Sequence, residues 1–117
     1  MMKGLIAAAL LVGAVSAQAD DSALAESFGY AMQAASQCDE LNMRMDTEGA
    51  VSDKLGEPVR DAEGYKSGLF GAINADDAGE DICQVAWQKY GCGGTEVKGL
   101  VQQNPFTQNN PVLCEYQ

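Results

Sequence analysis

Cysteines are the residues of this chain whose spacing says most about chemistry. The four are Cys38, Cys83, Cys92 and Cys114. No two of them have the C-x-x-C spacing of a thioredoxin-type redox pair or a haem attachment site. The 117 residues include no histidine, which excludes Cys–His and Ser–His nucleophile pairs and mixed Cys–His zinc sites. An even number of cysteines in a short chain indicates disulfides when the chain is exported, as the N-terminal segment described below predicts. We therefore predict two structural disulfides.

Helix geometry limits how these cysteines can pair. A helix over residues 75–90 would separate Cys83 from Cys92 by about 13 Å along its axis, and a disulfide needs Cα atoms within about 7 Å. Two connectivities remain, Cys38–Cys83 with Cys92–Cys114, or Cys38–Cys92 with Cys83–Cys114. We favour the first, because Cys38 and Cys83 lie on inward helix faces and Cys92 follows a helix end. A Cys₄ zinc site would need reduced thiols in an oxidising compartment.

An export signal is indicated at the start of the chain. Residues 1–19 have a basic residue, Lys3, then an apolar run over 5–15 and a small-x-small pattern at 17–19. The run is shorter than the roughly 20 apolar residues of a spanning helix. We predict a cleaved signal peptide over 1–19, one domain over 20–117, and a periplasmic or secreted protein without stable membrane insertion.

The remaining 98 residues are strongly acidic. All 17 acidic residues lie after Ala19, whereas one of the seven basic residues lies before it, so the net charge changes from −10 to −11. This charge repels nucleic acid and anionic lipid headgroups. It favours a basic protein or a cationic ligand as partner.

Hydrophobic periodicity predicts an all-α fold of about four helices with an irregular C-terminal tail. Apolar residues at steps of three and four indicate helices over 22–46, 61–75 and 74–91, with short helices over 47–56 and from Thr95 to Asn104. Ser22, Asn74 or Asp76, and Thr95 are the expected N-caps, and Gly56 and Gly91 the expected ends. The glycine-rich segment 61–75 would either offer a small-residue face that a neighbouring helix can approach closely or be partly loop.

Two groups of side chains could hold a metal ion. The acidic segment 74–81 has some of the spacing of a calcium loop but lacks the bidentate glutamate at its twelfth position. The candidate residues there are Asn74, Asp76, Asp77, Glu80 and Asp81. Met43 and Met45 form an M-x-M pair that suits copper(I), although Met45 also fits the apolar stripe of the first helix. Anions at a helix start and core packing explain the same residues.

No catalytic pattern occurs in the sequence. It lacks S-x-x-K, G-x-S-x-G and P-loop patterns, and no carboxylate pair stands out for acid–base chemistry. Trp87 and Tyr90 could line a pocket, but their helical spacing favours the core. We expect a non-enzymatic binding or envelope-accessory protein without a cofactor. The alternative is a carrier of a ligand or of calcium or copper, using segment 74–81 or Met43 and Met45.

Overall fold

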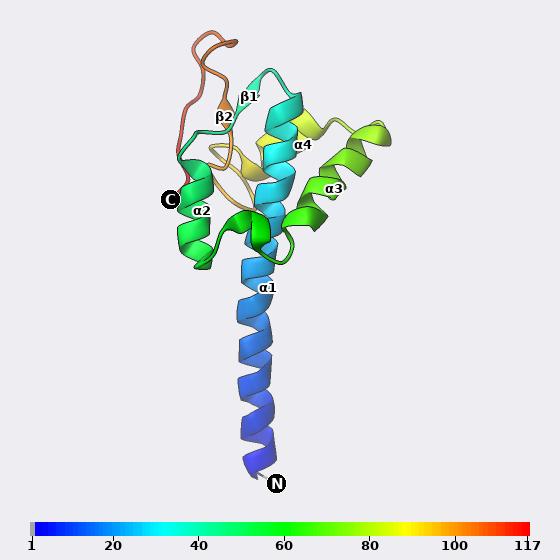
Figure 1. The fold of residues 1–117 in the computed structure, drawn as a ribbon, viewed down its shortest axis with the longest axis vertical. Helices are drawn as coiled ribbons and strands as arrows, with labels where there is room; N and C mark the ends of the chain where they lie inside the picture. The colour runs from blue at the N-terminus through cyan, green and yellow to red at the C-terminus, as the bar shows by residue number, and fades with distance from the viewer. Residues whose placement is uncertain (1) are drawn as a thin grey trace.

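The computed structural model describes the backbone of residues 2–117 and the side chains of residues 20–117. The described part contains four α-helices, one short 3₁₀ helix and two very short strands (Figure 1). In chain order these are α1 (Met2–Gln37), β1 (Leu41–Asn42), α2 (Thr47–Leu55), η1 (Val59–Asp61), α3 (Tyr65–Asp77), α4 (Ile82–Tyr90) and β2 (Gln102–Gln103). The predicted all-α class is confirmed. None of the helices, over the residues described, is both long and apolar enough to cross a membrane.

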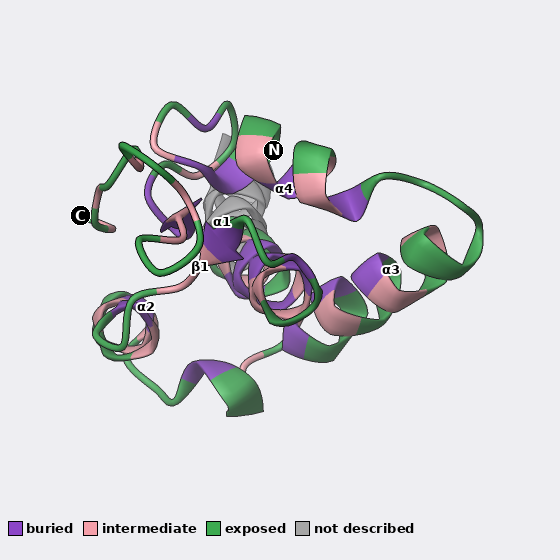
Figure 2. Ribbon diagram, turned by 90° about the horizontal axis from the view of Figure 1, so that it is seen from above, coloured by how far each residue is buried: buried purple, intermediate pink, exposed green. Residues whose placement is uncertain are grey.

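The other elements surround the C-terminal half of α1, and α2 and α3 lie on opposite sides of it (Figures 1 and 2). The α1 residues Ala25, Phe28, Ala31 and Ala34 are fully buried. Small alanines on this face allow neighbouring backbones to approach α1, and Phe28 fills the space between them. The ring of Phe28 lies 6.2 Å from that of Tyr65 on α3.

Glycine makes the contact between α1 and α3 especially close. A Cβ atom added to Gly68 would overlap the backbone of Glu26, and one added to Gly29 would overlap the backbone of Tyr65. The two helices therefore touch backbone to backbone through one glycine on each side. The small-residue face expected of segment 61–75 is therefore present at Gly68, although the helix begins at Tyr65 and not at residue 61, which belongs to η1.

The predicted bounds of the first helix are wrong at both ends. α1 runs through Ser22 without starting there, and it ends at Gln37 rather than at residue 46. Cys38 is still buried, as predicted, but the chain then turns into β1. The predicted signal peptide, residues 1–19, lies outside the described side chains.

The short helix predicted over 47–56 is confirmed. α2 ends at Gly56, which has a φ of +78°, and its amide donates to the carbonyl of Ser52. A residue with a side chain is disfavoured in this left-handed conformation, so glycine suits the helix end. The chain then enters η1, whose Val59 amide donates to the hydroxyl of Ser52.

The boundary between α3 and α4 differs from the prediction. α3 continues through Asn74 and Asp76 to Asp77, so neither residue caps the next helix. Asp81 is the N-cap of α4, and its side chain accepts a hydrogen bond from the Gln84 amide at 3.1 Å. Gly79, with a φ of +88°, lies in the turn between the two helices.

The helix predicted to start at Thr95 is absent, because this segment bonds to the end of α4 instead. The amides of Thr95 and Val97 donate to Gln88 and Lys89 carbonyls, and the Val101 amide donates to Tyr90. These bonds satisfy carbonyls that the C-terminus of α4 leaves free. The chain then enters β2, which pairs antiparallel with β1, Leu41 opposite Gln103.

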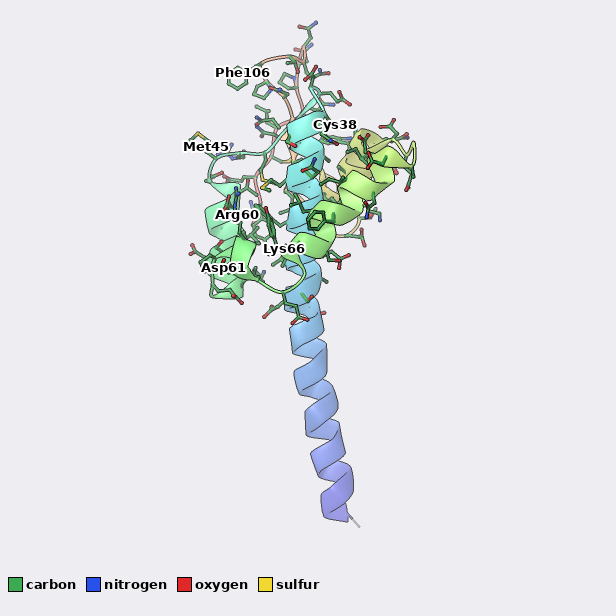
Figure 3. All side chains as sticks on the ribbon, turned by 45° about the vertical axis from the view of Figure 1, so that its right-hand side comes forward. Cys38, Met45, Arg60, Asp61, Lys66 and Phe106 are labelled. Carbon is green, nitrogen blue, oxygen red and sulfur yellow. A yellow bond between two sulfur atoms is a disulfide. The ribbon has the colours of Figure 1, made fainter. Side chains whose placement is uncertain are left out.

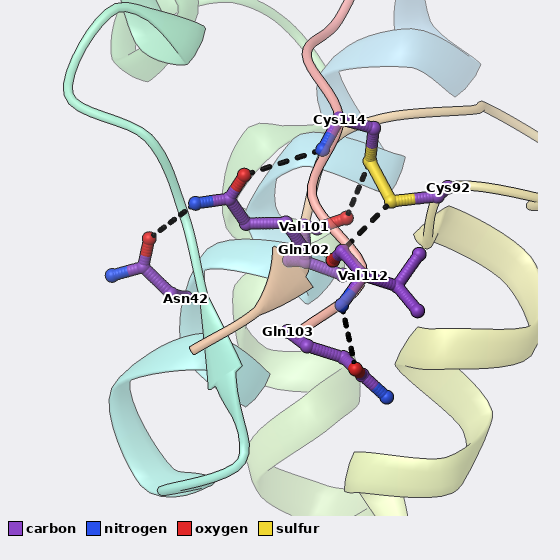
Figure 4. The surroundings of a disulfide bond; sticks show 7 residues. All are labelled: Asn42, Cys92, Val101, Gln102, Gln103, Val112 and Cys114. Atoms are coloured by element: carbon purple, nitrogen blue, oxygen red, sulfur yellow. Dashed lines mark hydrogen bonds between the residues drawn. A yellow bond between two sulfur atoms is a disulfide. The ribbon is translucent and has the colours of Figure 1, made fainter. Parts of the chain in front are cut away.

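The preferred disulfide connectivity is confirmed. Cys38 bonds to Cys83, joining the end of α1 to α4, and Cys92 bonds to Cys114, joining the end of α4 to the tail. The tail is irregular, as predicted, but it is anchored to β2. Figure 4 shows the Cys114 amide donating to the Gln102 side chain and the Val112 amide donating to Gln103.

Candidate functional site: an acidic cleft at Trp87

The four predicted cysteine sites are structural rather than chemical, since each cysteine is disulfide-bonded. Over residues 20–117, the one group of three or more possible metal ligands is Cys38, Glu40 and Cys83. The two sulfurs of this group are bonded to each other. A carboxylate oxygen of Glu40 lies within 4.8 Å of both, so the disulfide has a negative charge beside it.

The five candidate ligands of segment 74–81 are divided between α3 and the turn that follows it. Asn74, Asp76 and Asp77 belong to the end of α3, and Glu80 and Asp81 lie in the turn before α4. All five side chains are exposed. Asp76 and Asp77 therefore lie at the negative end of a helix dipole rather than at its positive end, contrary to the prediction.

Met43 and Met45 occupy different environments. Met43 is half-buried against the hydrophobic core, whereas the side chain of Met45 is 102% exposed and points away from the ribbon (Figure 3). The prediction that Met45 packs in the core is wrong, because α1 ends before reaching it.

A cleft with a volume of about 290 Å³ lies where α4 meets the two strands. Its walls come from three parts of the chain: the turn and strand after α1, the start and middle of α4, and the segment around β2. The lining residues are Glu40, Leu41, Asp81, Cys83, Gln84, Trp87, Gln103 and Gln108. The volume is just below the range of typical small-molecule sites, so a small ligand or a single side chain would fill it.

Trp87 reaches this cleft because of its position on α4. It lies one turn after Cys83 on the same helix face, and Ile82, Ala86 and Tyr90 beside it are buried. Tyr90 belongs to the core, as predicted, and its burial raises the pKa of its phenol. Trp87 is only half-buried, so part of the indole remains available in the cleft.

The turn that carries Glu40 is held by hydrogen bonds from the segment after β2. The Glu40 carbonyl accepts a hydrogen bond from the Asn104 amide at 2.9 Å, and the neighbouring Asp39 carbonyl accepts from the Thr107 hydroxyl at 2.7 Å. The disulfide of Cys38 fixes the start of the same turn. The turn that carries Glu40 is therefore fixed at both ends.

The charge of the cleft is negative. Its lining includes two carboxylates, from Glu40 and Asp81, and neither lysine nor arginine. The three glutamine side chains add amide oxygens that can accept hydrogen bonds. An indole face attracts a cation through its quadrupole, and nearby carboxylates strengthen that attraction. These groups together suit the binding of a cationic group.

Sequence reasoning found only part of this site. It placed Trp87 on the correct helix face and noted Asp81 in the acidic segment. Glu40, Gln103 and Gln108 were missed, because they meet the cleft through contacts between segments more than 60 residues apart. The sequence feature that could have indicated this site is the single tryptophan in a strongly acidic chain.

Comparisons with protein-family models, with curated proteins and with solved structures find no match to this chain.

Proposed function

We propose that this protein is a soluble, exported, non-enzymatic binding protein that takes a cationic group in the Trp87 cleft. The cation is an organic ammonium ion or a basic side chain of a protein partner. Export, to the periplasm or outside the cell, is supported by the signal-like residues 1–19 and by two disulfides, which persist in oxidising compartments.

The observation that carries the proposal is the composition of the cleft. It combines a partly exposed indole with two carboxylates, in a chain whose net charge is already −10. The field of the whole molecule would raise the local concentration of cations, and the indole would select those with a weakly hydrated, organic surface.

Fluorescence titration tests the proposal directly, because Trp87 is the chain's only tryptophan. Choline and N-acetyl-arginine amide serve as the two cations, at constant ionic strength. The neutral isostere 3,3-dimethylbutanol controls for apolar contact alone. We expect at least one cation to give a saturable change in Trp87 emission, and the isostere to give none.

Charge-neutralising variants locate the binding. Glu40→Gln and Asp81→Asn each remove one carboxylate, and asparagine keeps the N-cap acceptor of α4. Each should weaken cation binding about twofold to fivefold. Asp61→Asn on η1, an exposed aspartate outside the cleft lining, makes the same charge change and should leave binding unchanged. No response to either cation, or an equal response to the isostere, contradicts the proposal.

The metal-carrier alternative makes a different prediction. A ligand that binds only the native state raises the melting temperature. A calcium carrier using segment 74–81, or a copper carrier using Met43 and Met45, would therefore melt at a higher temperature with its ion. We expect neither ion to change the melting temperature, whereas a saturable rise would favour the carrier.

A further inference from the structure

Basic residues are few, and half of those after Ala19 have carboxylate partners. Arg44, Arg60 and Lys89 pair with Asp46, Glu48 and Glu96 at 3.1, 2.9 and 3.5 Å. Lys54, Lys66 and Lys98 make no ion pair within residues 20–117, and residues 1–19 contain no carboxylate side chain. These three lysines are thus unpaired in a chain with 17 acidic residues, and their ammonium groups are available to an anionic ligand.

Two of these three lysines line one cleft. Lys54 is in the last turn of α2, and Lys98 lies 44 positions later in the segment that follows α4. Both line a cleft with a volume of about 560 Å³. Its lining residues are Leu24, Lys54, Cys92, Val97, Lys98, Glu115, Tyr116 and Gln117.

The floor of this cleft is the edge of the hydrophobic core. Leu24, Val97 and Tyr116 are half-buried and pack against the core, so each leaves apolar surface toward the cleft. Burial raises the pKa of the Tyr116 phenol, and its hydroxyl is a hydrogen-bond donor like that of any neutral phenol. The cleft thus combines an apolar floor with two ammonium groups.

One carboxylate side chain, Glu115, also lines the cleft. Arg44 lies 3.6 Å from its Oε2 atom, and this offsets part of its charge. Arg44 is not among the cleft residues. The lining therefore presents two lysines against one carboxylate side chain that already has a basic neighbour.

We propose that this cleft binds a free monocarboxylate with an apolar chain, such as a medium-chain fatty acid. The carboxylate lies between Lys54 and Lys98, and the alkyl chain covers Leu24, Val97 and Tyr116. Local charge complementarity of this kind is needed, because the overall field of the acidic chain would otherwise repel an anion. This inference is independent of the proposed function of the Trp87 cleft.

Calorimetric titration of the oxidised protein tests the inference, with dodecanoate below its micelle concentration as the probe. Dodecanol and dodecyltrimethylammonium are the neutral and cationic controls. We expect saturable binding of dodecanoate, and weaker or no binding of the other two. Equal binding of all three would show an unselective apolar surface and would overturn the proposal, as would no binding of dodecanoate.

Single and double lysine variants test whether Lys54 and Lys98 bind the carboxylate of dodecanoate. Lys54→Gln and Lys98→Gln should each weaken dodecanoate binding about threefold, and the double variant about tenfold. Glu115→Gln should tighten it. Lys66→Gln is the matched control, because it removes the third unpaired lysine from α3, outside the cleft lining, and should leave binding unchanged. If Lys66→Gln weakened dodecanoate binding as much as the cleft variants do, binding would depend only on the net charge of the protein. That result would also overturn the proposal.

Discussion

Thr47, the first residue of α2, has a buried hydroxyl without a hydrogen-bond partner. Its side chain is 2% exposed, and no donor or acceptor among the described residues reaches its Oγ1 atom. An unsatisfied buried hydroxyl typically costs about 1–3 kcal/mol of stability. The threonine methyl group still packs in the core, so the unfavourable part of this residue is a single oxygen atom.

Replacing that oxygen by a methyl group should therefore stabilise the fold. We expect Thr47→Val to raise the free energy of unfolding by about 1 kcal/mol, measured by urea denaturation. Thr95→Val, at an exposed threonine, should change it little. A less stable Thr47 variant would show that the hydroxyl has a partner in solution, such as a bound water.

The cysteines and Glu40 show which features of the sites could be predicted from the sequence. The pairing of Cys38 with Cys83 was preferred over one alternative, because apolar spacing indicated that both residues face inward, and the structure confirms it although α1 ends before Cys38. Glu40 could not be assigned to the Trp87 cleft in the same way. The conformation of its turn depends on hydrogen bonds from Asn104 and Thr107, which no local pattern encodes.

At the scale of elements, the α1–α3 contact depends on glycine where helix propensity would favour alanine. Gly68 and Gly71 are on the same helix, but only Gly68 faces another backbone. A Cβ atom at Gly71 would meet nothing within 4 Å. Substitution of Gly71 therefore tests helix propensity alone, whereas substitution of Gly68 also tests the packing of α3 against α1.

We expect opposite effects from alanine at these two glycines. Gly68→Ala should lower the free energy of unfolding by about 2 kcal/mol or more, since α3 must move away from α1. Gly71→Ala should raise it by about 0.5–1 kcal/mol through helix propensity and the unfolded state. Thermal and urea melts of both variants check this, and a stabilising Gly68→Ala would rule out the close contact.

The ion pair between Glu48 on α2 and Arg60 on η1 makes the stability of the fold depend on pH. Arg60 donates to both carboxylate oxygens of Glu48, at 2.9 and 3.0 Å, and this hydrogen bonding lowers the pKa of Glu48. A lowered folded-state pKa adds stability above the ordinary glutamate value, and that stability is lost as the pH falls through the lowered value. Both side chains are about half exposed, so solvent screening keeps the contribution small.

Arg60→Gln should thus destabilise the protein at neutral pH by at most about 0.5 kcal/mol. The difference from the parent should shrink between about pH 5 and pH 3, as Glu48 takes up its proton. Urea melts across this range measure it, with Lys66→Gln as an unpaired control. A difference that grows on acidification would contradict the assigned sign.

Element boundaries were the least predictable part of the fold, for a physical reason. Leu41 and Met45 continue the apolar spacing of α1, yet Leu41 is buried through β1 and Met45 is fully exposed. The spacing there is coincidental. Likewise, Leu100 and Val101 are buried, but the amides of their segment donate to carbonyls at the end of α4 and do not form the predicted helix. Neither the exposure of Met45 nor the hydrogen-bond partners of residues 95–101 could be read from local sequence.

At the scale of the whole molecule, the two disulfides have different tasks. Cys38–Cys83 spans 45 residues and joins the two helices that meet at the core. Cys92–Cys114 spans 22 residues and retains the tail, whose Phe106 and Leu113 are 88% and 55% exposed. Little apolar burial would hold the tail without this bond.

Paired alanine variants should separate these tasks. Removing Cys38 and Cys83 should lower the free energy of unfolding by about 2–5 kcal/mol. Removing Cys92 and Cys114 should affect the melt less but expose the tail to chymotrypsin after Phe106. Melting curves and mass spectrometry of the fragments check both. Indistinguishable melts and cleavage patterns would contradict the division.

Formation of the Trp87 cleft depends on the C-terminal tail and on the two disulfides. Gln103 and Gln108 form one wall, and the amide of Val112, two residues before Cys114, holds the Gln103 side chain. The other wall depends on the turn that follows Cys38. A newly made, reduced chain contains every residue of the cleft but neither bond that brings its walls together. On the proposed function, cation binding in the Trp87 cleft should therefore depend on oxidation of the chain.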